Sequence, residues 1–260
     1  MTTHDTAATP TTTDATTIPS WSKTRVLAVW AAAALPMAIH AWVVTPLLAH
    51  AFSGPTALPR ALILSLTAGL VWQFCLVLLV LRREQGTLSW PVVKAALWLN
   101  TPVSTRTGKP NKRLWWMVVP LMLLLAAEEM LPAIPSPVSR DSAAFFASHT
   151  GQEWMSGNWI WLAILVVQFT FNTALGEELL FRGLLLPRMG SFGRFDWLVN
   201  GVLFAGYHLH EPWVIPQTVL VDTFALALPS RRWRSALIGI VVHSGQTVFF
   251  FVIALALVLR

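Results

Sequence analysis

Long apolar runs alternate with short polar stretches along most of the chain. A run of about 20 apolar residues is typical of a helix that crosses a membrane. The pattern therefore predicts an all-α, polytopic membrane helix bundle, without an internal repeat or a second domain. Seven runs are expected to be transmembrane helices: Val26–Ala49, Ala61–Leu81, Leu114–Leu131, Trp154–Met189, Trp197–His210, Trp213–Leu228 and Ala236–Leu259.

Other segments differ from these spanning runs. Leu88–Leu99 is apolar but too short to cross, and with its two tryptophans we expect a helix that lies in the membrane interface. Residues 1–22 are rich in Thr, Ala, Asp and Pro and have no apolar core of a signal peptide, so we expect a disordered cytoplasmic tail. Residues 23–260 would then form the transmembrane domain. Pro36 and Pro46 are expected to kink or end the first spanning helix.

Composition supports the membrane assignment, and charge indicates the topology. Of the 260 residues, 55% are hydrophobic and 12% are charged, whereas about 25% of residues are charged in soluble domains. Lys and Arg cluster between the apolar runs, most densely from Arg82 to Arg113. The positive-inside rule places these loops and the N-terminus in the cytoplasm, and we expect the cell membrane of a prokaryote. The sequence has no nucleic-acid motif, and its single cysteine, Cys75, excludes an internal disulfide.

Ionisable residues inside the apolar runs are the candidate functional residues, because burying them in a membrane is costly. The segment GEELLFRG, residues 176–183, places Glu177, Glu178 and Arg182 in the fourth run. Glu178 and Arg182 are four residues apart, so in an α-helix they share a face and can form an ion pair. Glu177 points elsewhere and has no cation at that spacing, which suits a general base.

Two histidines are expected to lie at a similar depth. At about 1.5 Å per helical residue, Glu177 and His208 lie roughly 16 Å, and His243 roughly 13 Å, from the basic ends of their helices. This agreement predicts one polar cavity that opens toward the cytoplasm. In it, Glu177 and His208 would hold and deprotonate a water molecule. His243, with Gln246 or Thr247, would stabilise an oxyanion.

Two other interpretations of these residues stay open. Glu177, His208 and His243 match a known set of catalytic zinc ligands, although the His-Glu-x-x-His motif is absent. A transporter that used Glu177 or Asp222 as a proton site would be expected to show repeated halves. The sequence shows no such repeat.

A second glutamate pair, Glu128–Glu129, ends the third run beside a proline-rich loop. No arginine follows it at the spacing of the first pair. We therefore expect this second pair to cap the helix at the membrane interface rather than to take part in catalysis.

Three motifs together resemble those of the CPBP family of intramembrane proteases, which includes type II CAAX prenyl endopeptidases and bacteriocin-processing and immunity proteins. The resemblance covers roughly residues 110–255. The motifs, in chain order, are Glu177-Glu178-x-x-x-Arg182, Phe204-x-x-x-His208, and His243 on the last run.

The resemblance implies an endopeptidase that cleaves a membrane-associated, lipidated or unmodified peptide or protein, with Glu177 and His208 activating water and His243 supporting the oxyanion. Phe204 and the remaining charged positions of the first motif would support the site. The family has been described both as metal-dependent and as glutamate-dependent, and the division of roles above favours glutamate without a cofactor. Thr247 stands where the family motif has Asn, so a non-catalytic immunity or scaffold protein is the alternative.

Overall fold

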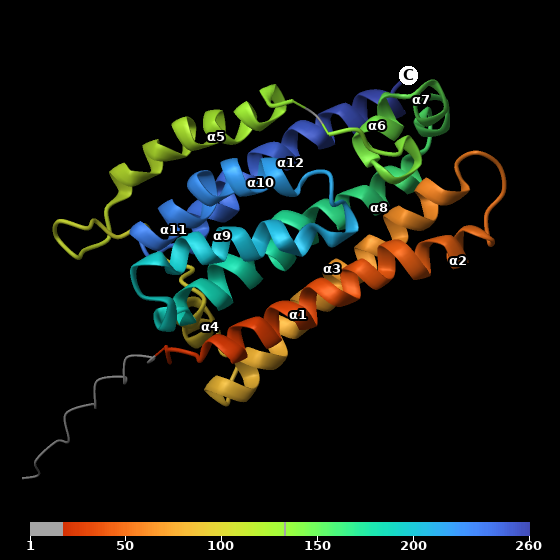
Figure 1. The fold of residues 1–260 in the computed structure, drawn as a ribbon. Coiled ribbons are helices and arrows are strands. Elements are labelled where there is room, and N and C mark those ends of the chain that lie inside the picture. Colours follow the sequence, from red (N-terminus) through yellow and green to blue (C-terminus); the bar gives the residue numbers. More distant parts are fainter. Residues whose placement is uncertain (1–17, 133) are drawn as a thin grey trace, which may run out of the picture.

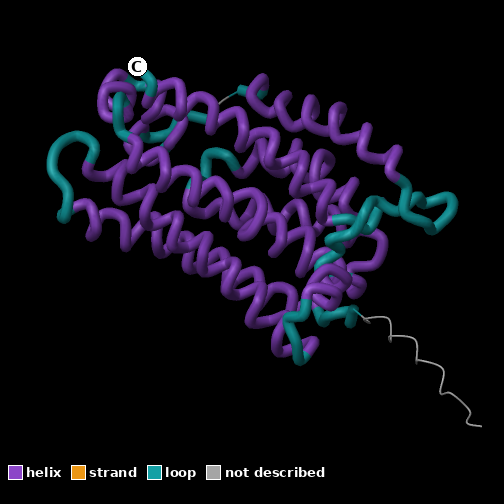
Figure 2. The backbone as a smooth tube through the Cα atoms, turned by 180° about the vertical axis from the view of Figure 1, so that it is seen from behind, coloured by secondary structure: helices purple, strands orange, loops and turns teal. Residues whose placement is uncertain are grey.

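The computed structural model describes residues 18–132 and 134–260, and over these ranges the chain is helical, without a β-sheet (Figure 2). The prediction of an all-α membrane helix bundle is confirmed. Most of the predicted disordered tail, residues 1–17, lies outside the described part of the chain.

The predicted spans appear as helical segments of unequal length. Three are shorter or interrupted: α5 (Val118–Ala126) lies between short 3-10 helices, α9 is Asp196–Tyr207, and α10 (Ile215–Asp222) continues through a π-helical stretch into α11 (Leu228–Arg232). The count of seven transmembrane helices therefore stays a prediction. Four segments of the described chain are long and apolar enough to cross a membrane: Lys23–Ala49, Ala57–Gln85, Trp159–Arg188 and Ala236–Val258.

The helices form one elongated bundle (Figure 1). Helices α1 (Lys23–Ile39) and α3 (Ala57–Gln85) run side by side along one side of it, and α5 runs along the opposite side. Between them lie α9, α10, α12 (Ala236–Val258), and α8 (Trp159–Phe169) with its continuation, the π-helical segment η5 (Thr170–Leu185).

Short helices close the two ends of the bundle. Helices α6 (Ser142–Ala147) and α7 (His149–Met155) lie at the end that holds the C-terminus, near α2 (Thr45–Ala49) (Figure 1). Helix α4 (Trp90–Ala96) lies with α11 at the other end, where the basic loops gather. The two ends thus differ in charge as well as in structure.

Helix α4 corresponds to the predicted interfacial helix, but it packs more tightly on the bundle than expected. Trp90 is exposed at its start, whereas Ala96 and Leu97 are buried at its end. The absence of a side chain at Gly183 of η5 permits this contact, because a Cβ there would lie 3.3 Å from the Leu97 carbonyl oxygen. The helix therefore plugs this end of the bundle as well as facing the interface.

The prolines of the first span do not end it, contrary to one of the two expectations. The chain stays helical from Lys23 to Ala49, with Pro36 inside α1. A π-helical turn, η1 (His40–Val44), directly precedes the α2 segment that contains Pro46. The wider hydrogen-bond spacing of a π-turn accommodates a residue that has no backbone N–H to donate.

A buried ion pair joins four segments at the basic end of the bundle. Arg188 donates from Nε at 2.9 Å and from Nη2 at 2.6 Å to one carboxylate oxygen of Glu84 in α3. The indole of Trp21 donates to the other oxygen at 2.8 Å. Nη1 of Arg188 also donates to the carbonyl oxygens of Ala96 and Leu184. These bonds fix the N-terminal segment, α3, α4 and the end of the fourth span to one another.

We expect Arg188→Met to lower the unfolding free energy by about 3 kcal/mol, because it removes the buried guanidinium that pairs with the Glu84 carboxylate and donates to two carbonyl groups. Thermal unfolding of the detergent-solubilised protein measures the change. Arg194→Met is the matched control: Arg194 is exposed on the following turn, and its loss is expected to change stability by less than about 0.5 kcal/mol. Equal shifts for the two variants would contradict a stabilising role of the cluster.

Candidate functional site

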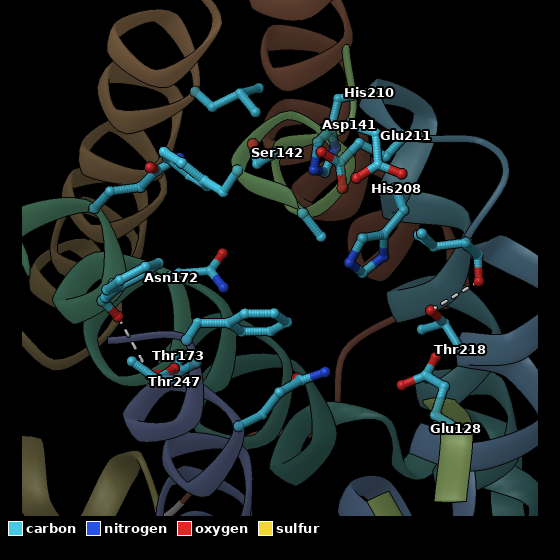
Figure 3. A pocket seen from close by; sticks show the side chains of 18 of the residues that line it. Glu128, Asp141, Ser142, Asn172, Thr173, His208, His210, Glu211, Thr218 and Thr247 are labelled. Atoms are coloured by element: carbon cyan, nitrogen blue, oxygen red, sulfur yellow. Dashed lines mark hydrogen bonds between the residues drawn. The ribbon is translucent and has the colours of Figure 1, made fainter. Parts of the chain in front are cut away.

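A cavity of about 660 Å³ lies inside the bundle (Figure 3). Its walls come from η5, α9, α10, α12 and the segment that carries α6. The structure thus brings together most of the residues that the sequence singled out, although they are far apart along the chain. Those that line the cavity are Glu177, Phe204, His208, His243, Gln246 and Thr247.

The cavity extends toward the end of the bundle opposite the basic loops. Its lining includes Asp141, Gln152 and Arg260, and no residue of the basic segments 82–113, 188–196 and 229–235 is among the described residues that line it. The expectation of a cavity open toward the basic loops is therefore wrong. Helix α9 has only 12 residues and ends inside the bundle, so the cavity lies beyond the C-terminal end of this helix. The depth of a residue along its helix does not show toward which end of the bundle the cavity extends.

The glutamate pair lies in a π-helical segment, η5 (Thr170–Leu185), not in the α-helix that the spacing argument assumed. The predicted ion pair is nevertheless present: Arg182 Nη1 lies 3.2 Å from Glu178 Oε1, and both side chains are 0% exposed. π-Helical segments bond i to i+5 and are frequent at functional sites, and sequence periodicity does not indicate them.

Glu178 has a second cation-forming partner, which spacing could not identify. His243 Nδ1 lies 3.0 Å from Glu178 Oε1, and the Arg182 guanidinium lies over the Phe204 ring at 4.0 Å. Glu178 and Arg182 do not line the cavity but lie behind it. Together they hold His243 and Phe204 in place at its wall.

Glu177 faces the cavity and is only 2% exposed. Its side chain interacts with Tyr207, whose hydroxyl oxygen accepts a hydrogen bond from Gln73 Nε2 at 2.6 Å. The sequence interpretation missed both Tyr207 and Gln73. Two features of the sequence could have indicated them. Both residues are polar groups within apolar runs, and Tyr207 is the single tyrosine of the chain.

The two histidines present the same ring nitrogen for chemistry. His208 Nδ1 donates to the Phe204 carbonyl oxygen at 3.0 Å, and the ring packs edge-on against Phe204. His243 Nδ1 is bonded to the carboxylate of Glu178. When neutral, both rings therefore have Nε2 as a hydrogen-bond acceptor, and donation to an oxyanion from His243 requires the imidazolium form.

Neutral donors line the same cavity. Gln246 and Thr247 follow His243 by one turn of α12, and Asn172 and Thr173 come from η5 (Figure 3). The sequence interpretation did not include these two η5 residues. An amide or hydroxyl group can donate to an oxyanion without a change of charge.

The cavity also contains acidic residues that were not assigned to a site. Glu128 lines the cavity, a position that the expectation of an interfacial cap did not include. Its 3-10 helix, Ala127–Met130, packs against α10, which carries Asp222. Asp222 and Glu211 line the same cavity, whereas the side chain of Glu129 lies outside the described part of the structure.

The zinc alternative requires Glu177, His208 and His243 to lie close together around one ion. Among the described residues, no three His, Cys, Asp or Glu side chains lie together in a way that could hold a metal ion. Nδ1 of His243 is already bonded to Glu178. A zinc ion would therefore bind this histidine through Nε2, as is usual when the other ring nitrogen donates to a carboxylate.

The fold and the site define an integral membrane protein, a helix bundle with a buried carboxylate–histidine cavity. A family model described as type II CAAX prenyl endopeptidase Rce1-like matches residues 142–249. This match confirms the resemblance to the CPBP family and supports a protease. The matched range contains Glu177, His208 and His243. No curated protein and no solved structure matches the chain.

We expect Gly239→Ala to disturb the network behind the cavity. A Cβ at Gly239 would overlap with Glu178 Oε2 and would lie 3.0 Å from Ser230 Oγ. Such overpacking costs about 1–3 kcal/mol, which a lower unfolding temperature in detergent would show.

Gly206→Ala provides the control on the neighbouring helix α9, because the nearest atom to its Cβ would be an ordinary contact at 3.7 Å. A Gly239→Ala variant that unfolds at the wild-type temperature would show that the network tolerates displacement of Glu178.

Proposed function

We propose that this protein is an intramembrane endopeptidase in which Glu177 and His208 activate the attacking water. The observation that carries the proposal is the different surroundings of the two adjacent glutamates. Glu178 is fully buried against Arg182 and His243, whereas Glu177 lines a cavity shared with His208. Glu177 is thus the carboxylate available to a substrate.

In the proposed reaction, a water molecule donates one hydrogen bond to Glu177 and the other to His208 Nε2. Glu177 takes a proton as the water oxygen attacks the peptide carbonyl carbon. The carbonyl oxygen becomes an oxyanion, stabilised by Gln246, Thr247 or the imidazolium of His243. Glu177 then gives its proton to the leaving amine as the C–N bond breaks. The Glu178 carboxylate balances the charge of a protonated His243.

The cavity lining supports a substrate with apolar parts. Phe169, Phe250 and Leu257 line the cavity together with the polar site. A prenyl group or an apolar transmembrane segment is compatible with these walls. That the substrate is a prenylated C-terminus rests on the description of the family model alone.

We expect Glu177→Ala to lower cleavage by at least about 100-fold, because a general base typically contributes 100- to 10,000-fold. One assay measures cleavage of a fluorogenic farnesylated CAAX peptide by the purified protein in liposomes. A second assay compares the membrane-protein fragments of cells that carry the wild-type protein with those of cells that carry the variant. Glu153→Gln is the control, since the Glu153 side chain is 70% exposed at the end of the bundle. Unchanged turnover by Glu177→Ala would exclude the proposed role.

Chelators separate the glutamate mechanism from the zinc alternative. Treatment with 1,10-phenanthroline is expected to leave cleavage unchanged if Glu177 acts without a metal. Stoichiometric zinc in the purified protein, together with loss of activity on chelation and recovery on zinc addition, would establish the metal mechanism instead.

The charge distribution gives a proposal for orientation. If the basic loops and the N-terminus lie in the cytoplasm of a prokaryotic cell, the mouth of the cavity faces the other side of the membrane. Substrates would then reach Glu177 from the non-cytoplasmic half of the bilayer. This replaces the cytoplasmic approach that the sequence alone predicted.

Cysteine labelling tests this orientation. In a Cys75→Ala background, an impermeant maleimide is expected to label Arg260→Cys, at the cavity mouth, in intact cells. Arg106→Cys, exposed in the most basic loop, should be labelled only after the membrane is permeabilised. The reverse labelling pattern would place the cavity mouth in the cytoplasm.

A non-catalytic immunity or scaffold protein is the second candidate, and Thr247 in place of the family Asn favours it. In that case Glu177→Ala and His208→Ala would both preserve the cellular phenotype of the protein. Thr247→Asn distinguishes the two candidates further. In a protease, cleavage by this variant should be equal to or higher than that of the wild type, whereas in a scaffold no cleavage should be detected with either protein.

A further inference from the structure

The proposed hydrolysis leaves one buried carboxylate of the cavity unused. Asp222 lies on α10, lines the cavity and is 6% exposed. Among the described residues, its Oδ1 has no hydrogen-bond partner. A buried carboxylate without a partner is costly to ionise, and a cation or a donor from a ligand would offset this cost.

The cavity as a whole has an excess of acidic groups. Five carboxylates line it, at Glu128, Asp141, Glu177, Glu211 and Asp222, whereas Arg260 is the single Lys or Arg among the described lining residues. Arg260 lies at the mouth and donates to Gln152.

Neighbouring groups reduce this excess only in part. Asp141 already accepts from Ser136 and from the Ala144 backbone N–H. Arg182 is close enough to Asp222 to interact electrostatically, but it lies behind the cavity and is paired with Glu178. A positively charged group bound in this cavity would be stabilised by the remaining excess of carboxylates.

Asp222 and Glu128 form an acidic wall beside the reacting groups. The two interact electrostatically, and Asp222 also lies within electrostatic range of Glu177. Figure 3 shows Glu128 and Thr218 together on one wall, across the cavity from Asn172 and Thr247. A group held at this wall would therefore lie in the same cavity as a peptide bond positioned at Glu177.

We infer that Asp222, with Glu128 beside it, binds a cationic side chain of the substrate, a lysine ammonium or an arginine guanidinium close to the cleaved bond. The inference rests on the proposed function, because it takes the cavity as the peptide-binding site. An ammonium or guanidinium group would supply the donors that Asp222 lacks, through charge-assisted hydrogen bonds. The acidic wall then determines specificity for basic substrates, while Glu177 performs the hydrolysis.

Binding, measured apart from cleavage, tests this subsite. The probe is a set of fluorescent farnesylated CAAX peptides in which one lysine is moved through the positions around the cysteine, each paired with its norleucine counterpart. Anisotropy is measured with Glu177→Gln protein in nanodiscs. We expect one lysine peptide to bind at least about tenfold more tightly than its norleucine pair. Adding Asp222→Asn should reduce that ratio to about one.

Thr218→Val is the control, because Thr218 lines the cavity one turn before Asp222 but its hydroxyl is bonded to the Val214 carbonyl oxygen. It should keep the lysine preference. Retained binding of the norleucine peptide shows that Asp222→Asn protein is folded. The inference would be overturned if the protein that retains Asp222 bound the lysine and norleucine peptides of every pair equally. That result is expected if Asp222 and Glu128 only share a proton with each other. An unchanged ratio in Asp222→Asn would also overturn the inference.

Failure of the proposed function has a different signature. If Glu177 is not the catalytic base, Glu177→Ala protein still cleaves the peptides, whatever the lysine preference. A lysine preference lost in Asp222→Asn would then remain valid for the binding site, whereas the hydrolytic role of Glu177 would not.

Discussion

The cost of burying charge in an apolar bundle is the constraint on which this structure depends. Glu178 and Arg182 are both fully buried, and either alone would be an uncompensated charge far from water. Their pairing explains why Gly239 has no side chain beside them and why Phe204 packs against the guanidinium. Because Glu178 also bonds His243, the same pair fixes a residue of the cavity wall. The arrangement of the site is thus a consequence of neutralising one glutamate.

This cost is also the reason that much of the site could be predicted from the sequence. A carboxylate or histidine inside an apolar run has few structural explanations, so Glu177, His208 and His243 were recognisable, and all three line one cavity. The pairing of Glu178 with Arg182 could be predicted because residues four apart lie on the same face of a helix. The helical fold followed for the same reason, since a membrane admits few other backbones.

Features that depend on packing between distant segments could not be predicted. The partnership of His243 with Glu178, the support of Glu177 by Tyr207 and Gln73, and the direction of the cavity require knowledge of which helix ends meet. The place of Glu128 in the cavity wall was not predicted, because its position at the end of a run resembles an interfacial cap. In the structure, packing of its 3-10 helix on α10 brings it to the cavity. Local sequence contains no information about that contact.

Adjacent glutamates acquire different surroundings because successive side chains of a helix point in different directions. Over Thr170–Leu185 the helix turns more widely than an α-helix, and Glu178 faces Arg182 and α12 while Glu177 faces the cavity. The partners of the two side chains are therefore not interchangeable. Glu178 is held by a cation and a histidine, whereas Glu177 has a tyrosine and open space. A carboxylate that accepts protons must not be permanently neutralised, so the different directions of the two side chains separate the residue that stabilises the bundle from the residue that can react.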